Sequence, residues 1–310
     1  MCALWFRQAV GIVALGGIVL AAGCQGRGPE QEIPSAQPSV ANPVPDAPAP
    51  ARESSADAVK PETAAPPEPS GWGHLSGRFV FDGAPPAPRA LTITSDKEFC
   101  SLHNPQDESI VVHSGNSGLA NVVVTLSPSR TEPSPAVHDS YGATAAAKVQ
   151  LDNQKCRFQP HVLAMRTSQT LEILNSDEVA HNTKIDTLKN PPINFTLPAG
   201  GSLEQRFAVE ERAPAQVSCS IHPWMVAWVV VRKDPYFAVA DANGAFTIQN
   251  LPAGKWTFQA WHEQARFIAR VRQQDQPAEW DRGRFIAEIK PNETTDLGEI
   301  RVERSLFGGR

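Results

Sequence analysis

The residue types best suited to chemistry in this 310-residue chain lie in one segment, Cys219-Ser220-Ile221-His222-Pro223-Trp224-Met225, with His181 38 residues before the cysteine. A thiolate, two imidazoles and a thioether are the ligands of a blue (type 1) copper site, in which Cys and two His bind in a plane and Met is a weak axial ligand. Such ligands suit both Cu(I) and Cu(II), so the pattern predicts one-electron transfer. Zinc is the alternative metal, because Cys and two His also bind Zn²⁺, although a thioether is a poor zinc ligand.

Predicted strands adjoin both groups of candidate ligands. Residues 170–174 precede the segment that carries His181, and residues 226–231 follow Met225 directly. Beyond Gly71, short β-branched and aromatic runs alternate with Gly, Pro, Asn and Asp clusters, and no long window has helical periodicity. The sequence therefore predicts an all-β fold of sandwiches or barrels, with few and short helices.

The segment from Lys148 to Arg232 resembles the cupredoxins. Its Cys-x-x-His-x-x-Met spacing is similar to the short ligand loop of amicyanin, and Arg157-Phe158-x-Pro160 stands where the family enters the strand before its first ligand. The resemblance implies a Greek-key β-sandwich over residues 146–233. It also implies one type 1 copper, with His181, Cys219, His222 and Met225 as ligands.

The same resemblance implies roles for three neighbours of the ligands. Asn182 would tie the two ligand loops together, as the residue after the first histidine does in the family. The edge of the His222 ring would reach the surface through an apolar patch that contains Pro223 and Trp224. Electrons would then enter and leave the protein through this edge.

Two separated segments of the chain resemble one further fold. Gly77-x-Phe79, the run from Gly118 to Leu126, Asp241-x-x-Gly244-x-Phe246 and Leu251-Pro252-x-Gly254-Lys255-Trp256 are similar to the carboxypeptidase regulatory-like, transthyretin-like (Ig-like) β-sandwich. We expect a discontinuous sandwich, 73–130 plus 235–304, with the cupredoxin segment inserted between its strands. Three modules in a row are the alternative. Asn243-Gly244 predicts a tight hairpin turn, and Trp256 and Trp261 are predicted in the core of this sandwich.

The N-terminal region has the pattern of an exported, anchored protein. An apolar run over residues 9–23 is too short to span a bilayer and is typical of a signal peptide; it ends in Leu20-Ala21-Ala22-Gly23-Cys24, which resembles the lipobox of bacterial lipoproteins. The resemblance implies a signal peptide over 1–23 and lipidation of Cys24. The protein would be extracytoplasmic and lipid-anchored to the cell or outer membrane, on the periplasmic side or at the cell surface. An ordinary secretory signal is the alternative.

A proline-rich stretch follows the predicted anchor. Eleven of the 28 prolines fall in residues 25–70, which contain no aromatic residue. Such a composition favours disorder, so residues 24–72 are predicted to form a flexible tether between membrane and body. A neutral spacer without a selected length is the alternative.

The remaining cysteines and histidines have simpler interpretations. In an exported protein Cys100 and Cys156 form a natural disulfide pair, although two separately buried thiols are the alternative. The other candidate ligands have no partner at ligand spacing and are expected to be ordinary surface or strand-end residues: His103, His113, His138, His161 and His262.

Charge and missing motifs exclude several functions. The body beyond residue 70 carries 24 basic and 26 acidic residues, which argues against nucleic acid as a partner. No His-x-His pair, Gly-x-Ser-x-Gly elbow or His-Glu-x-x-His helix is present in the sequence. We therefore expect an electron carrier between redox proteins rather than an enzyme, and we expect it to need no small-molecule substrate. The alternatives are a copper-handling protein, for sequestration or delivery, and a surface module that binds protein or carbohydrate with a structural copper.

Overall fold

The computed structural model describes residues 69–128 and 134–308, and these are almost entirely β-strands joined by turns. The prediction of an all-β fold built from sandwiches is confirmed. The predicted signal peptide, Cys24 and most of the predicted tether lie outside the described residues. Among the described residues, no helix has the length and apolar character needed to cross a bilayer.

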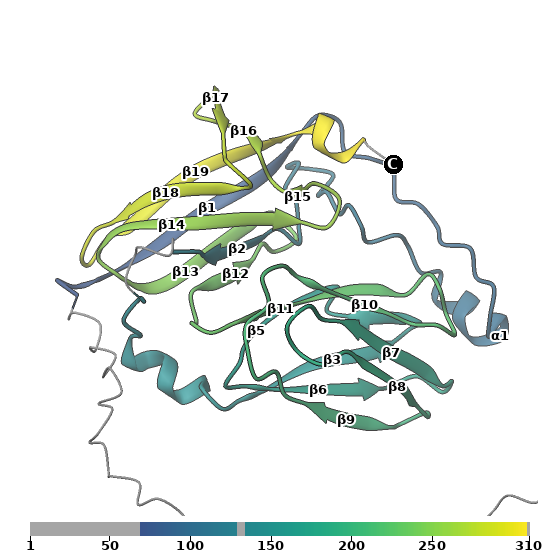
Figure 1. The fold of residues 1–310 in the computed structure, drawn as a ribbon. Coiled ribbons are helices and arrows are strands. Elements are labelled where there is room, and N and C mark those ends of the chain that lie inside the picture. Colours follow the sequence, from purple (N-terminus) through teal and green to yellow (C-terminus); the bar gives the residue numbers. More distant parts are fainter. Residues whose placement is uncertain (1–68, 129–133, 309–310) are drawn as a thin grey trace, which may run out of the picture. The chain divides into compact units, whose positions relative to one another are not determined.

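One sandwich combines strands from both ends of the described chain (Figure 1). Its first sheet has the order β13 (Ala245–Pro252), β1 (Trp72–Asp82), β19 (Thr294–Glu303), β16 (Arg270–Gln273) and β17 (Gln276–Glu279). Its second sheet has the order β12 (Phe237–Val239), β2 (Val123–Leu126), β14 (Gly254–His262) and β15 (Arg266–Phe267), and β18 (Arg284–Ile289) pairs with β14. The strands β1 and β2 thus find their partners among strands that begin more than a hundred residues later.

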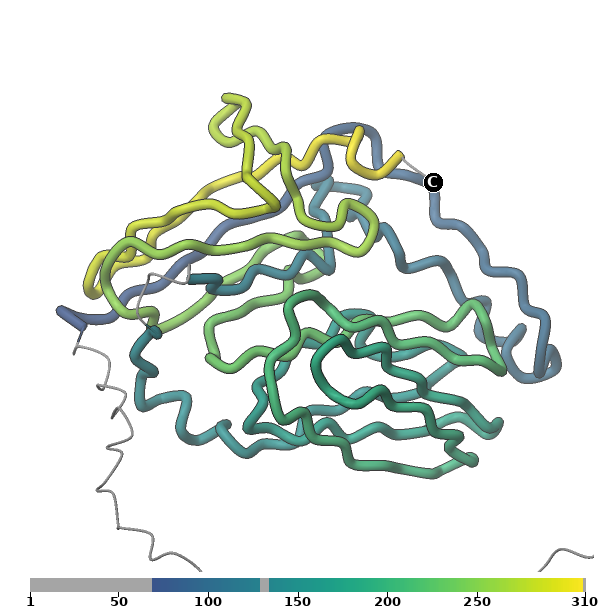
Figure 2. Tube along the Cα trace, in the orientation of Figure 1, coloured from purple at the N-terminus to yellow at the C-terminus, as the bar shows by residue number. Residues whose placement is uncertain are grey.

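The other sandwich is formed by the strands between β2 and β12. One sheet has the order β5 (Val162–Arg166), β11 (Val226–Arg232), β10 (Ala215–Ser218), β7 (His181–Asp186) and β8 (Ile193–Leu197). The facing sheet has the order β4 (Arg157–Gln159), β3 (Lys148–Gln154), β6 (Thr170–Asn175) and β9 (Ser202–Gln205). These strands lie together in the lower half of Figure 1, and the tube in Figure 2 shows the chain entering and leaving this unit.

The helices of the described residues are short and lie in connections. They are α1 (Lys97–Cys100) and the 3₁₀ turns η1 (Ser101–His103), η2 (Asp139–Thr144) and η3 (Arg304–Phe307). The segment that carries α1 leaves β1 in the upper sandwich and runs down to lie beside the lower one (Figure 1). A disulfide joins Cys100, the last residue of α1, to Cys156 in the turn between β3 and β4. A connection of the first sandwich is therefore covalently attached to the second.

Strand β11 is buried on both faces, which explains why its sequence is almost continuously apolar. Ala227, Val229 and Val231 point into the core of the lower sandwich. Because side chains alternate along a strand, Trp228 and Val230 point the other way and pack in a third apolar cluster.

The third cluster lies between the two sandwiches. It joins Trp228 on β11 to Val123 on β2 and Trp261 on β14, and the rings of Trp228 and Trp261 are 5.0 Å apart between centroids. Trp261 was predicted in the core of the first sandwich, and this prediction is wrong: the ring faces outward from that core, against β11. The register of β14 turns its side chain to this face, a choice that alternation alone leaves open.

The Asn243-Gly244 turn forms, but the strands on its two sides do not pair with each other. Gly244 has a φ of 77°, and a Cβ placed on it would lie 2.0 Å from the Phe79 carbonyl oxygen, so only glycine fits. β12 pairs with β2, whereas β13 pairs with β1. The predicted hairpin is therefore wrong. The turn carries the chain from the sheet that contains β12 to the sheet that contains β13.

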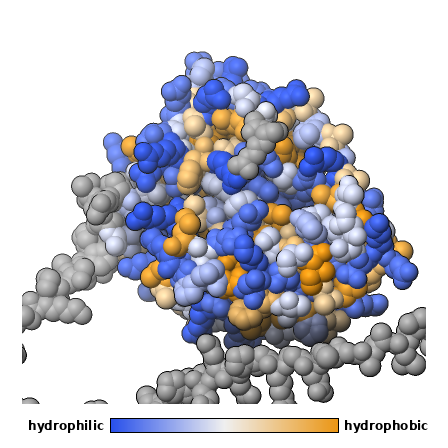
Figure 3. Space-filling model, turned by 45° about the vertical axis from the view of Figure 1, so that its right-hand side comes forward, coloured by the Kyte–Doolittle hydropathy of each residue, from blue (hydrophilic) through white to orange (hydrophobic). Residues whose placement is uncertain are grey.

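The surface of this body mixes polar and apolar residues. On the face drawn in Figure 3, hydrophilic and hydrophobic residues are interspersed. Several exposed charges pair with the opposite sign, such as Arg78 with Glu299 and Lys148 with Glu204. Exposed pairs of this kind contribute about 0–1 kcal/mol each, so the apolar clusters must supply most of the stability.

Two histidines near the contact between the sandwiches are buried. His161 lies before β5 and His262 ends β14, so both occupy strand ends, but neither is solvated. His161 Nε2 lies 2.6 Å from Glu263 Oε2, and His262 Nδ1 accepts a hydrogen bond from the Gln264 N–H. Burial, followed by the nearby His161, lowers the pKa of His262 to about 3.

The buried His262 predicts a loss of stability in acid. Below a pH of about 6.5 the unfolded chain binds a proton at this histidine, whereas the folded protein stays neutral there down to about pH 3. Between these limits the free energy of unfolding falls by up to about 1.4 kcal/mol per pH unit from this group. In urea unfolding between pH 6.5 and 4.5, the free energy of unfolding of His262→Asn should depend less steeply on pH than that of the wild type. An unchanged slope would contradict the prediction, and His113→Asn, at an exposed histidine, is the control.

Candidate metal centre

His181 is the first residue of β7, and a carboxylate holds its ring. His181 Nε2 lies 2.9 Å from Asp177 Oδ2, and both side chains are almost fully buried. The Asp177 carboxylate also accepts hydrogen bonds from the backbone N–H groups of Lys155 (2.5 Å) and Cys156 (2.8 Å). Burial would raise the pKa of Asp177, but these hydrogen bonds and His181 outweigh it and lower the pKa below its ordinary value.

Cys219, His222 and Met225 lie in the loop between β10 and β11, which closes on itself. The Met225 N–H donates to the His222 carbonyl (2.9 Å), and the Cys219 N–H donates to the Met225 carbonyl (3.3 Å). The Cys219 sulfur accepts hydrogen bonds from two backbone N–H groups, those of His222 (3.4 Å) and Asn182 (3.3 Å). The loop therefore presents the sulfur inward while Met225, 1 % exposed, packs in the core of the lower sandwich.

The structure brings three of the predicted ligands together. One nitrogen of His181, one of His222 and the Cys219 sulfur all lie within 4.8 Å of one another. Cys219 Sγ is 3.7 Å from His222 Nδ1, and the two imidazole centroids are 4.6 Å apart. All three side chains are buried. The second cluster of this kind among the described residues contains Cys156, whose sulfur is already in the disulfide.

The free atoms of this cluster fit a metal that prefers nitrogen and sulfur. His181 Nδ1 is buried and has no hydrogen-bond partner, although the other ring nitrogen is held by Asp177. A buried polar atom without a partner costs free energy, and a bound ion would remove that cost. Metal-binding histidines commonly hold their other ring nitrogen on a carboxylate in this way.

The cysteine also has the protonation state that a ligand needs. Burial would raise the pKa of Cys219, but the nearby His181 ring, the contact with His222 Nδ1 and the two backbone N–H donors lower it to about 6. For His181, burial would lower the pKa, but Asp177 and the Cys219 sulfur raise it above its ordinary value. At neutral pH the site thus favours a thiolate, which is the form that binds metal.

Asn182 connects the two loops that carry the candidate ligands. Its side-chain oxygen accepts hydrogen bonds from the backbone N–H (3.2 Å) and the hydroxyl (3.0 Å) of Ser220, the residue after Cys219. Its side-chain NH₂ donates to Asn194 Oδ1 (2.8 Å) and to the Phe195 carbonyl (3.0 Å). The side chain therefore links β8 to the cysteine loop, and its own backbone N–H reaches the sulfur.

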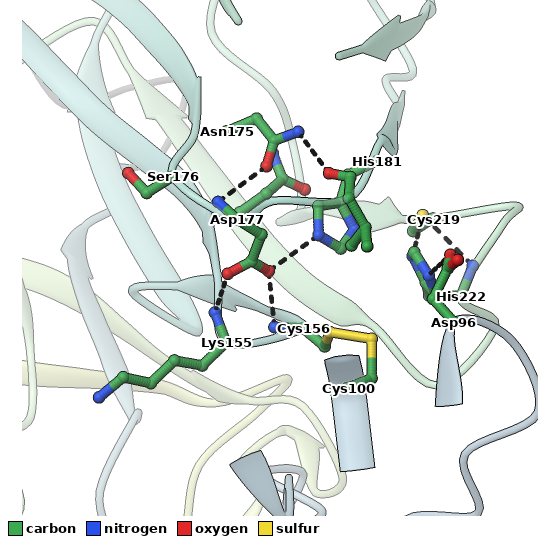
Figure 4. Close-up of polar contacts among 12 residues, drawn as sticks. Asp96, Cys100, Lys155, Cys156, Asn175, Ser176, Asp177, His181, Cys219 and His222 are labelled. Atoms are coloured by element: carbon green, nitrogen blue, oxygen red, sulfur yellow. Dashed lines mark hydrogen bonds and ion pairs between the residues drawn. A yellow bond between two sulfur atoms is a disulfide. The ribbon is translucent and has the colours of Figure 1, made fainter. Parts of the chain in front are cut away.

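The environment of His222 differs from the prediction. The edge of its ring was expected at the surface, but His222 is 0 % exposed, and its Nε2 lies 2.8 Å from Asp96 Oδ2 (Figure 4). Asp96, directly before α1, lies against the outer nitrogen of the ring, and the Trp224 ring packs beside the imidazole with 5.1 Å between centroids. Pro223 is exposed and Trp224 is half-buried, with its indole N–H donating to the Cys156 carbonyl (3.2 Å).

Sequence reasoning missed the two carboxylates of the site. Asp177 stands four residues before His181, a spacing that could have been noticed. Asp96 is 126 residues from His222 in the sequence, and no motif connects them. The only signal was the expected pairing of Cys100 with Cys156, which brings the α1 segment to this sandwich.

Comparison with known proteins gives only partial likenesses. No protein-family model matches the chain, and no curated protein matches it. Solved structures similar to part of it include a purple cupredoxin from Nitrosopumilus maritimus, at 26% identity over 26% of this chain and 97% of that chain, with a TM-score of 0.23. An amicyanin variant matches at 19% identity over 35% of this chain and 98% of its own, with a TM-score of 0.25.

A copper-containing nitrite reductase from Thermus scotoductus SA-01 matches at 21% identity over 34% of this chain, with a TM-score of 0.25. This chain spans only 25% of that enzyme's chain.

The link through Asn182 predicts a weaker metal site when it is removed. In Asn182→Ala the Ser220 N–H loses its acceptor, and the position of the neighbouring Cys219 is less well fixed. Loss of such a supporting contact typically lowers metal affinity about 10- to 100-fold. Competition with a Cu(I) chelator measures this change. Asn194→Ala removes only the exposed acceptor of the Asn182 amide and should have a much smaller effect; equal effects would contradict the prediction.

Proposed function

We propose that the chain is a membrane-anchored, extracytoplasmic type 1 copper protein that passes single electrons between protein redox partners. The observation that carries the proposal is the buried convergence of His181, Cys219 and His222, with an unpartnered nitrogen on His181 and a thiol whose pKa is lowered to about 6. Met225 closes the same loop and would supply the axial thioether.

Copper, when bound, supplies a one-electron couple. The residues of the chain would keep the site nearly unchanged between the two oxidation states. The closed loop from Cys219 to Met225 and the Asn182 link hold the sulfur, while Asp177 and Asp96 hold the outer nitrogens of the two imidazoles. A buried, hydrogen-bonded set of ligands moves little, and burial excludes water from the metal.

We further propose that the described part of the chain consists of two domains, one of which holds the copper site. Residues 73–130 and 235–304 would form a carboxypeptidase regulatory-like sandwich, with a cupredoxin domain over 146–233 inserted between β2 and β12. The pairing of β2 with both β12 and β14 supports the insertion. The role of the first sandwich would be to carry the connection between β1 and β2, which contains Asp96 and α1, to the metal site.

A second candidate function is copper sequestration. The observation in its favour is the cover over His222, since all three converging ligands are buried and Asp96 occupies the outer side of the imidazole. A store needs affinity but no fast electron exchange. The two functions therefore differ in whether the bound copper can be oxidised and reduced reversibly at an electrode.

The copper proposal predicts a defined spectrum. The purified full-length protein with one equivalent of Cu(II) should develop an intense thiolate-to-copper absorption band and a narrow EPR hyperfine splitting. Cys219→Ser should lose the band because no thiolate remains in the site. Reversible voltammetry supports the carrier, whereas binding without electrode response supports the store. A colourless copper-loaded protein, or preferential binding of zinc, would contradict the proposal.

The proposed anchor predicts a lipid on Cys24. Intact-mass measurement of the mature protein should show acyl chains and removal of residues 1–23, and the protein should fractionate with membranes. More than one acyl chain is required for stable anchoring. Cys24→Ser should move the protein to the soluble fraction, whereas the matched change Cys2→Ser, within the removed segment, should not. A membrane-bound Cys24→Ser protein would count against the lipid anchor.

A further inference from the structure

Asp96 brings a carboxylate from one sandwich to the metal centre of the other. It lies between β1 and β2, whereas His222 lies between β10 and β11. The imidazole is completely buried, and the Asp96 side chain is 42% exposed. The carboxylate therefore has one side on the His222 ring and the other in solvent, and it closes the ring off from the outside.

The backbone at Asp96 is held in an unusual conformation. Asp96 has φ 44° and ψ 44°, in the left-handed region, and its carbonyl accepts the N–H groups of Phe99 (3.1 Å) and Cys100 (2.8 Å) at the start of α1. Asp and Asn adopt the left-handed region more readily than most residues other than glycine. At this turn the Asp96 carboxylate contacts His222 Nε2.

The Cys100–Cys156 disulfide connects the two carboxylates of the site. Cys100 is four residues after Asp96 and is held by its carbonyl. The Cys156 N–H donates to Asp177 Oδ2, the same oxygen that contacts His181 Nε2. Figure 4 shows Asp96 against His222, the Cys100–Cys156 disulfide, and Asp177 beside His181. One covalent bond thus supports the outer contacts of both imidazoles.

Both histidines consequently have the same arrangement. In each, Nε2 lies against a carboxylate oxygen, at 2.9 Å for His181 and 2.8 Å for His222, which leaves Nδ1 for the side of the sulfur. The hydrogen bond on one ring nitrogen decides which tautomer is present and how the ring is oriented. A negative charge beyond the ring also stabilises the more highly charged of two metal oxidation states.

We propose that Asp96 is a positioning residue for His222: it fixes the tautomer and orientation of the ring, lowers the reduction potential of the bound metal, and covers the ring edge through which a partner would otherwise make contact. The disulfide and the hydrogen bonds from the Phe99 and Cys100 N–H groups to the Asp96 carbonyl hold it in place. This inference rests on the proposed function, since it concerns the same copper. A redox partner would then meet Asp96 and α1 before it meets His222.

The first test uses the metal-free protein, so that it does not depend on copper. In the ¹⁵N-labelled full-length protein, the His222 Nε2–H should be visible by NMR and slow to exchange with water. In Asp96→Ala the exchange should be at least tenfold faster, because the acceptor and the cover are both gone. Asp96→Asn keeps an acceptor oxygen and should retain most of the protection. Asp107→Asn is the matched control, since it removes a carboxylate of the same segment that pairs with Arg89 instead.

The second test uses the copper-loaded protein and measures its reduction potential. Asp96→Asn keeps the shape of the side chain but removes its charge, so the variant should fold. It should favour Cu(I) over Cu(II) by about tenfold, which raises the reduction potential of this one-electron couple by about 59 mV. Asp107→Asn should leave the potential nearly unchanged. If the role of Asp96 were purely structural, Asp96→Asn would change the free energy of unfolding, but its reduction potential would equal that of Asp107→Asn.

A third variant tests whether the disulfide holds Asp96 in place. Cys100→Ser/Cys156→Ser removes the covalent link and should increase His222 Nε2–H exchange in the same direction as Asp96→Ala. Exchange equal to that of the wild type would show that the disulfide does not hold Asp96.

The outcomes separate this inference from the proposed function. If the wild type shows the copper band, but neither N–H exchange nor potential responds to the Asp96 variants, the role of Asp96 is overturned and the copper proposal stands. If N–H exchange responds as expected but no copper band forms, the copper proposal fails and the positioning of His222 by Asp96 remains supported.

Discussion

Two imidazoles and a thiol are buried within contact distance of one another, and every polar atom in such a place needs a partner. This requirement explains much of the surrounding structure. Asp177 and Asp96 take the outer nitrogens, two backbone N–H groups take the sulfur, and Asn182 connects the loops behind them. The His181 Nδ1 is left without a partner, and in the proposed site a metal ion would take this position.

The loop that carries Cys219 and His222 also depends on contacts between the two sandwiches. Strand β11 begins at the residue after Met225, so the strand that fixes the loop also carries Trp228 into the cluster with Trp261. On the opposite side, the disulfide fixes α1 beside the β3–β4 turn. The metal loop is therefore held between an apolar contact on one side and a covalent one on the other.

The sequence predicted those parts of the molecule that depend on local pattern. Strands such as β6 and β11 follow from β-branched runs and alternation, and the meeting of Cys219 with His222 follows from their spacing in one loop. Their role as copper ligands, with Met225, stays a prediction. The predictions that were wrong concern which of several distant strands pair or pack together. Asn243-Gly244 predicts a turn but not which sheets the next strands join, and the alternation of β14 does not say which of its faces meets β11. Asp96 reaches His222 across 126 residues, a contact that only the tertiary fold creates.

The pairing of β1 with β19 has a consequence for biosynthesis. Leu75 lies opposite Thr295 in this parallel pair, so β1, the second strand of its sheet, lacks one neighbour until the chain has been made as far as β19. The strands from β3 to β11 are complete some seventy residues earlier, and β1 with the α1 segment precedes them all. Contacts between residues so far apart form slowly, and an unpaired strand edge invites association with other chains in the meantime. The strands from β3 to β11 can thus pair before β19 has been made, whereas one edge of β1 stays open until this last partner arrives.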